Sequence, residues 1–227
     1  MKNWFLTVFL TLSAVVSAVA QNEVPTLNWP YLYPDFMEGE LVYGGGKTSK
    51  VKCNIHLGLG ALHIVDNGNI GETSTVGVYQ LIIGDKTLLN VGGKMMEILA
   101  QSEGGFVVQE TLANYSAVVR NDGAYGGSLS NAAKGFSYDE NIGNYGYLVT
   151  NVYEDLLSIK NEAEELPVTK TIYMVIESRQ VQANKKSVTD LDGVDKKAFS
   201  EFLKANGIKW KNPQDLIKVV DYISAVM

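Results

Sequence analysis

The chain has 227 residues, a formal net charge of −6 and 46% hydrophobic residues. These values exclude a globally disordered chain, and the lack of basic clusters argues against a nucleic-acid partner, whose phosphates need a positive surface. The single cysteine, Cys53, excludes an internal disulfide, so burial of apolar side chains must hold the fold together.

The first twenty residues have the composition of an export signal. Lys2 is the only charged residue before a short apolar stretch, and the segment ends on Ala18-Val19-Ala20. A basic end, a short apolar middle and small residues before the cut are typical of a bacterial signal peptide. We therefore expect residues 1–20 to be cleaved after Ala20, leaving a secreted or periplasmic protein without a transmembrane span. An uncleaved membrane anchor is the alternative.

The next part of the chain has the pattern of a β-rich domain, expected over residues 21–184. Short apolar or alternating runs separated by glycine-containing turns predict strands at Glu40–Tyr43, Lys50–Leu57, Ala61–Val65, Val78–Ile83, Lys86–Val91, Met95–Ala100, Phe106–Gln109, Tyr147–Val152 and Thr171–Ile176. The early connections are too short for parallel crossovers, which need a dozen or more residues. The sequence therefore predicts an antiparallel meander, as a curled sheet or a partial barrel.

One segment, Asn121–Tyr147, interrupts this pattern. It contains six glycines and almost no aliphatic run, which is typical of a long exposed loop. Tyrosines on such a loop can stack on sugars or contact a partner protein at a modest entropic cost. Its four tyrosines are therefore candidate ligand-binding residues: Tyr125, Tyr138, Tyr145 and Tyr147. A variable loop without function is the other interpretation.

Residues 185–227 change to a helical period. Phe199, Phe202 and Leu203 fall on one face of a predicted helix that ends near Gly207. A second helix is predicted after Asn212, with proline at its first position. Its apolar face consists of Leu216, Val219, Val220 and Ile223. The predicted fold class is therefore α+β, with a helical pair packed on the sheet.

The two histidines, His56 and His63, lie on either side of a predicted hairpin turn. A two-residue turn at Gly58-Leu59 would place both imidazoles on one face as diagonal neighbours, and Cys53 on the other face with the apolar residues. Such a pair could hold a metal or sense pH. Two ordinary surface histidines are the favoured interpretation, because no third ligand lies at a suitable spacing.

Other catalytic or metal-binding chemistry has little support in the sequence. No G-x-S-x-G turn is present, and a core Cys53 would be unreactive. Carboxylates are plentiful enough for a glycosidase, but the sequence does not bring two of them together. Asp190–Asp195 resembles the start of a calcium loop with Glu201 in the twelfth position, yet it lacks the glycine at the sixth, so a turn and a helix N-cap are expected. No metal or cofactor is expected.

The opening of the mature chain and its tail contain recognisable motifs. Asn28–Tyr43 reads N-W-P-Y-L-Y-P-D-F-M-E-G-E-L-V-Y, and V-K-C-N-I and A-L-H-I-V follow at Val51–Ile55 and Ala61–Val65. The tail, Phe199–Tyr222, contains the triplet N-G-I at Asn206-Gly207-Ile208 and the pair D-L at Asp215-Leu216. These stretches resemble a group of secreted proteins of Bacteroidota-type bacteria with a β-rich N-terminal region and a helical tail. The resemblance implies export and a β-then-α architecture, and it transfers no functional residue.

Taken together, these features favour an exported, non-catalytic envelope or surface protein that binds an unknown protein or glycan. One alternative is a glycan- or peptide-directed hydrolase that uses carboxylates. Another is a carrier that holds an apolar small molecule within a curved sheet.

Overall fold

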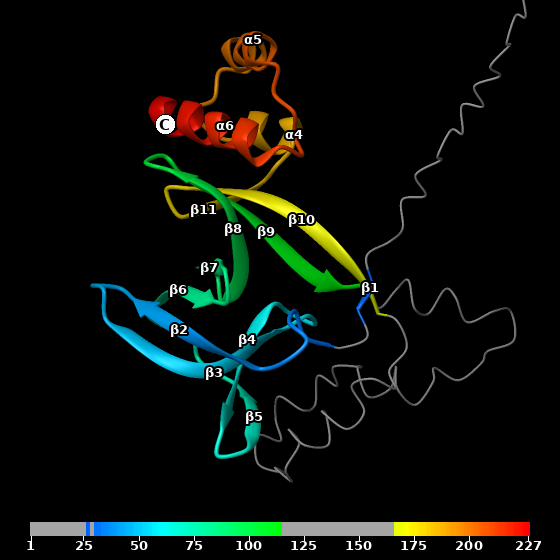
Figure 1. Cartoon of the computed structure of the whole chain (residues 1–227). Coiled ribbons are helices and arrows are strands. Elements are labelled where there is room, and N and C mark those ends of the chain that lie inside the picture. Colours follow the sequence, from blue (N-terminus) through cyan, green and yellow to red (C-terminus); the bar gives the residue numbers. More distant parts are fainter. Residues whose placement is uncertain (1–25, 28–29, 115–165) are drawn as a thin grey trace, which may run out of the picture.

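A computed structural model describes residues 26–27, 30–114 and 166–227, which form a curled antiparallel sheet with helices at one end (Figure 1). The signal segment, the predicted strand Tyr147–Val152 and the segment Asn121–Tyr147 lie outside these residues. The described strands are β1 (Thr26–Leu27), β2 (Met37–Tyr43), β3 (Thr48–His56), β4 (Ala61–Asp66), β5 (Asn69–Glu72), β6 (Val78–Ile83), β7 (Lys86–Val91), β8 (Lys94–Ser102), β9 (Gly105–Ala113), β10 (Leu166–Ile176) and β11 (Arg179–Gln182).

The strand order departs from a simple meander where β1 pairs with β10 and where β2 pairs with β6. The sheet runs β1-β10-β9-β8-β7-β6-β2-β3-β4-β5, with β11 paired to β10, and every pair is antiparallel. Because β6 pairs with β2 instead of β5, two meanders, β2–β5 and β6–β9, share one sheet. The predicted antiparallel fold class is confirmed.

The sheet curls until the turn after β3 reaches β8 and β9. The carbonyl of Gly60 accepts a hydrogen bond from the Met95 amide at 3.0 Å, and the carbonyl of Leu57 accepts one from the Ala113 amide at 2.8 Å. This contact closes one side of a partial barrel around an apolar core. The core consists of Leu41, Cys53, Ile55, Leu62, Val78, Leu81, Ile83, Leu88 and Met95.

Three helices cover the β8–β11 end of the sheet: α4 (Lys185–Thr189), α5 (Lys196–Asn206) and α6 (Pro213–Val226). Helix α6 packs against β8, β9 and β10. The second core lies beneath the helices and contains Val107, Met174, Phe199, Leu216, Val219, Val220 and Ile223. Among the described helices, none has both the length and the apolar character needed to cross a membrane.

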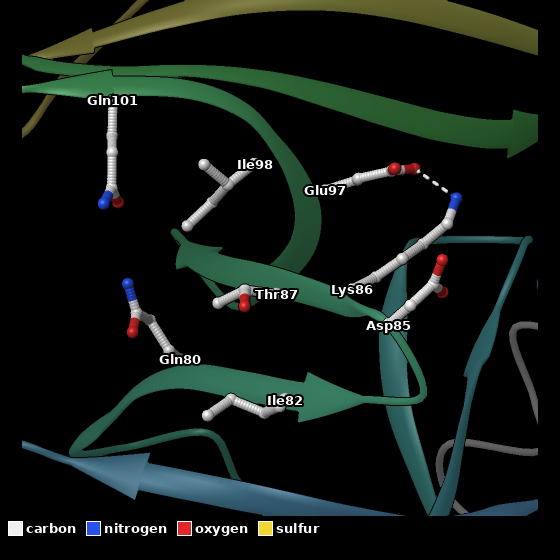
Figure 2. A pocket seen from close by; sticks show the side chains of 8 residues that line it. All are labelled: Gln80, Ile82, Asp85, Lys86, Thr87, Glu97, Ile98 and Gln101. Carbon is white, nitrogen blue, oxygen red and sulfur yellow. Dashed lines mark hydrogen bonds and ion pairs between the residues drawn. The ribbon is translucent and has the colours of Figure 1, made fainter.

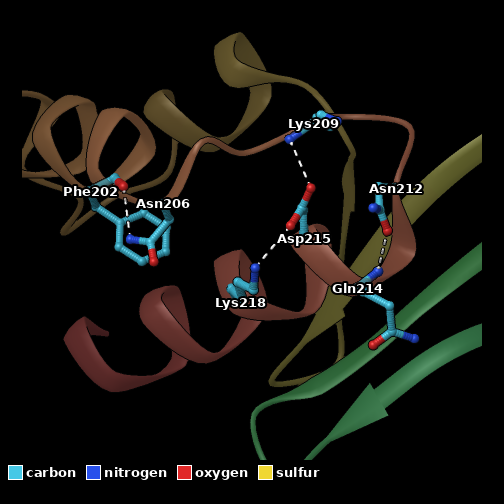
Figure 3. A network of polar contacts seen from close by, with 7 residues as sticks. All are labelled: Phe202, Asn206, Lys209, Asn212, Gln214, Asp215 and Lys218. Carbon is cyan, nitrogen blue, oxygen red and sulfur yellow. Dashed lines mark hydrogen bonds and ion pairs between the residues drawn. The ribbon is translucent and has the colours of Figure 1, made fainter.

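The ends of the two long helices follow their sequence signals. Gly207 adopts a left-handed conformation (φ 57°) after α5, and the Asn212 side chain accepts a hydrogen bond from the Gln214 amide before α6 (Figure 3). Asp215 joins the linker to α6, because its carboxylate accepts from the Lys209 amide and pairs with Lys218 at 2.9 Å. The hydrogen bond from Lys218 is the largest cause that lowers the pKa of Asp215.

Candidate functional site

The four tyrosines predicted to bind a ligand, Tyr125, Tyr138, Tyr145 and Tyr147, lie outside the described residues. Two places in the described part of the chain collect polar side chains instead. One surrounds the histidine pair on β3 and β4, and the other is a groove beside β6, β7 and β8.

The two histidines come together as the hairpin register predicts. His56 pairs with Ala61 and Asn54 pairs with His63, so both imidazoles lie on one face. Their rings stack with centroids 4.9 Å apart and an interplanar angle of 7°. Both histidines are half-buried, because the chain before β2 packs over them, so they are more covered than histidines on an open strand face.

The segment before β2 covers this face through Tyr31 and Phe36. The Tyr31 hydroxyl lies 3.1 Å from Nδ1 of His63, and the Tyr31 ring packs edge-on against both imidazoles. The buried Asn54 holds the segment in place. Its amide donates to the carbonyls of Tyr33 and Asp35, and its oxygen accepts from the Tyr33 amide. The histidine face is therefore partly covered.

Burial sets the protonation state of the pair. Desolvation is the first cause that lowers the pKa of His63 to about 4, and the charge of His56 adds to it. Desolvation also lowers the pKa of His56. Parallel rings cannot direct two nitrogens at one ion, and no group of three or more metal-ligating side chains occurs among residues 26–27, 30–114 and 166–227. The pair therefore has the features of a neutral, structural cluster.

Two other sequence candidates have structural roles. Cys53 faces the core with no exposed surface, and burial, followed by the charge of Glu38, raises its pKa to about 12. The thiol is thus protonated and inert. In the calcium-like stretch, the Asp195 carboxylate accepts from the amides of Lys197 and Ala198, as the expected N-cap of α5.

The groove arises because β8 leaves β7 halfway along its length. Only Lys94–Glu97 of β8 pairs with β7, and beyond this point β8 pairs with β9. The register shifts between Ile98 and Ala100, which marks a β-bulge at Leu99. Bulges bend a strand and redirect its side chains. The bent half of β8 therefore diverges from β7, as Figure 1 shows, and a space opens beside β6 and β7.

This space, the β6–β8 groove, has a volume of about 410 Å³, which is within the range of small-ligand sites. Its lining is mainly polar and consists of Gln80, Ile82, Asp85, Lys86, Thr87, Glu97, Ile98 and Gln101. The side chains of Gln101 and Ile98 point down from β8, and that of Gln80 points up from β6 (Figure 2). Thr87 lies between them on β7.

The charged residues gather at one end of the groove. Lys86 Nζ lies 2.9 Å from Glu97 Oε2, where β7 and β8 begin to separate, and Asp85 lies beside the pair (Figure 2). The buried Tyr33 hydroxyl has no hydrogen-bond partner within the described part of the chain. Burial, followed by the charges of Glu97 and Asp85, raises the pKa of Tyr33 to about 12. This hydroxyl therefore stays protonated near the acidic end.

An aromatic pair adjoins the other end of the groove. Tyr79 precedes Gln80 on β6, and its ring lies 6.4 Å from that of Phe106 in an edge-to-face arrangement. Phe106 on β9 is the direct cross-strand partner of Gln101. Tyr79 is 47% exposed, and the two rings, which are not part of the lining, each neighbour a glutamine that is.

Sequence reasoning did not find the groove. Most of its residues belong to predicted strands, whereas Asp85 lies in a predicted turn and Gln101 lies just beyond the predicted strand Met95–Ala100. The bulge that separates β7 from β8 has no distinctive residue, because Leu99 is an ordinary strand residue. The run Leu81-Ile82-Ile83 was the nearest signal in the sequence, because consecutive apolar residues in a strand point to both faces of the sheet, and the structure leaves Ile82 exposed. The chain matches no protein family, no curated protein and no solved structure.

Proposed function

We propose that this protein is an exported, non-catalytic binding protein and that the β6–β8 groove is one of its binding surfaces. The observation that carries the proposal is the lining of the groove, where neutral amides and a hydroxyl occupy the bent opening of the sheet. Such groups recognise a ligand by hydrogen bonds. The export signal expected at residues 1–20 supports a ligand of the envelope or the surroundings.

The charge arrangement favours binding over hydrolysis. A carboxylate hydrolase needs one acid to donate a proton and a second, ionised one to act opposite it. In the groove the Glu97 carboxylate is already occupied by an ion pair with Lys86 at 2.9 Å. The two carboxylates also lie at the same end of the groove, with the Lys86 side chain between them (Figure 2).

Hydrolysis remains the second candidate, because Asp85 and Glu97 both line the same groove. Release of a cleaved product would distinguish hydrolysis from binding alone. An apolar-ligand carrier has less support, since Ile82 and Ile98 are the two apolar residues in the lining.

The test begins with the full chain carrying a C-terminal tag, produced in a bacterial host and recovered from each cell fraction. The proposal predicts a periplasmic or extracellular product that begins at Gln21. The purified product is then incubated with a panel of oligosaccharides and peptides, and binding and release of new chain ends are both measured. Binding without cleavage supports the proposal. Cleavage that Glu97→Gln abolishes would establish the hydrolase instead, and a cytoplasmic, uncut product would refute export.

A further inference from the structure

We infer that the ligand of the β6–β8 groove is a neutral glycan. This inference rests on the proposed binding function and adds the class of ligand. It follows from three properties of the groove: the kind of hydrogen-bonding groups that point into it, its charge, and the aromatic surface at its end.

The hydrogen-bonding groups suit sugar hydroxyls. A primary amide offers two donor hydrogens and an acceptor oxygen, and a sugar hydroxyl both donates and accepts. The amides of Gln80 and Gln101 approach the groove from opposite strands, with the Thr87 hydroxyl between them (Figure 2). None of these three side chains has a hydrogen bond to another side chain in the part of the chain that the structure describes. They are therefore available to a ligand.

The charge of the groove selects against acidic ligands. Asp85 and Glu97 contribute two negative charges and Lys86 one positive charge, so the lining has an excess of one negative charge. Lys86 is already paired with Glu97 and cannot serve as an unopposed anion receptor. Since the whole chain is also acidic, sulfated, phosphorylated or uronic ligands would be repelled.

The aromatic surface suits the C–H face of a sugar ring. Tyr79 is exposed and is held edge-to-face against Phe106, which fixes its ring beside the amide-lined part. An aromatic ring buries a large apolar area, and a tyrosine does so with few rotatable bonds. A peptide held by its side chains is favoured by apolar anchor pockets, and the groove offers only two isoleucine side chains for this purpose.

The experiment uses the exported product and three neutral hexasaccharides, those of glucose, xylose and mannose, in isothermal titration calorimetry. We expect one of them to bind. Gln80→Ala and Gln101→Ala should each lower the affinity for that hexasaccharide about three- to tenfold, which is the effect of losing a neutral hydrogen-bonding group. Gln182→Ala, an exposed glutamine on β11 away from the groove, is the matched control and should leave the affinity unchanged. Circular dichroism establishes that all variants are folded.

The remaining outcomes separate this inference from the proposed function. If no hexasaccharide binds, or if the glutamine variants bind as the control does, the glycan assignment is wrong. If a peptide binds and the same two variants weaken it, the groove is a binding site but the ligand class is wrong. If a hexasaccharide binds and is cleaved, the ligand class stands and the non-catalytic function is wrong.

Discussion

Acidification should destabilise this protein through the histidine pair. The pKa of His63 is lowered from 6.5 to about 4 in the folded chain, first by desolvation and then by His56. Between these two values the unfolded chain binds more protons than the folded one, so the free energy of unfolding falls as the pH falls. From pH 7.5 to pH 5, this one group should cost about 2 kcal/mol of stability.

The assay is urea unfolding followed by tyrosine and tryptophan fluorescence, at pH 7.5 and at pH 5. Carboxylates also titrate near the lower pH, so the informative quantity is the difference between the wild type and His63→Gln. Glutamine cannot take up a proton but still offers an acceptor to the Tyr31 hydroxyl, which lies 3.1 Å from His63 Nδ1. The variant should lose about 2 kcal/mol less than the wild type over this interval.

Equal pH dependence in the wild type and His63→Gln would refute the reasoning, because the buried imidazole would then make no contribution. A wild-type protein that becomes more stable at pH 5 would refute its sign. The stacked rings would in that case share a proton instead of excluding it.

Two further substitutions test how the chain is held together, each by urea unfolding at pH 7.5. Asn54→Ala should lower the unfolding free energy by about 2–4 kcal/mol, because the backbone groups of Tyr33 would lose their buried partner. Gly105→Ala should lower it by about 3 kcal/mol or more, because a Cβ there would overlap the Val175 carbonyl oxygen. Gly44→Ala, where a Cβ meets nothing within 4 Å, is its control and should change stability by less than about 1 kcal/mol.

Each of these predictions has a result that contradicts it. A fully stable Asn54→Ala protein would mean that the segment before β2 does not depend on the asparagine. If Gly105→Ala lowered the unfolding free energy no more than Gly44→Ala does, then Gly105 would not lie as close to the Val175 carbonyl as the structure places it.

Local sequence signals were sufficient where neighbouring residues decide the structure. Strands β6 and β7 have the predicted bounds, because alternating residues flank the Gly84-Asp85 turn and Gly84 adopts a positive φ of 58°. Helix α6 begins where asparagine and proline predict it. Strand β11 was not predicted, because the turn before it places Glu177 and Ser178 at positive φ. Neither residue type is typical of that conformation, so the sequence does not indicate a turn there.

Pairing between distant segments could not be predicted. Strand β5 has the sequence N-I-G-E, which has no strand pattern of its own and is ordered by pairing with β4. The β2–β6 pair joins strands separated by a complete meander. The same limit applies to the histidines: their shared face follows from the local register, whereas their burial depends on Tyr31 and the long-range bonds of Asn54.

The candidate site shows this limit most clearly. Gln80 and Thr87 lie in predicted strands and Gln101 lies just beyond one, but the three face one space only because β8 bends at Leu99. A bulge depends on the pairing of both neighbouring strands, and a leucine at this position does not indicate one.

The central claim is that the opening between β7 and β8 binds a neutral glycan. Its most direct measurement is backbone amide chemical-shift mapping of the isotopically labelled protein during titration with each of the three hexasaccharides. If the sugar binds in the β6–β8 groove, the perturbed amides should cluster on β6, β7 and the bent half of β8, around Gln80, Thr87 and Gln101. Perturbations confined to the helices, or an unchanged spectrum with all three sugars, would contradict it.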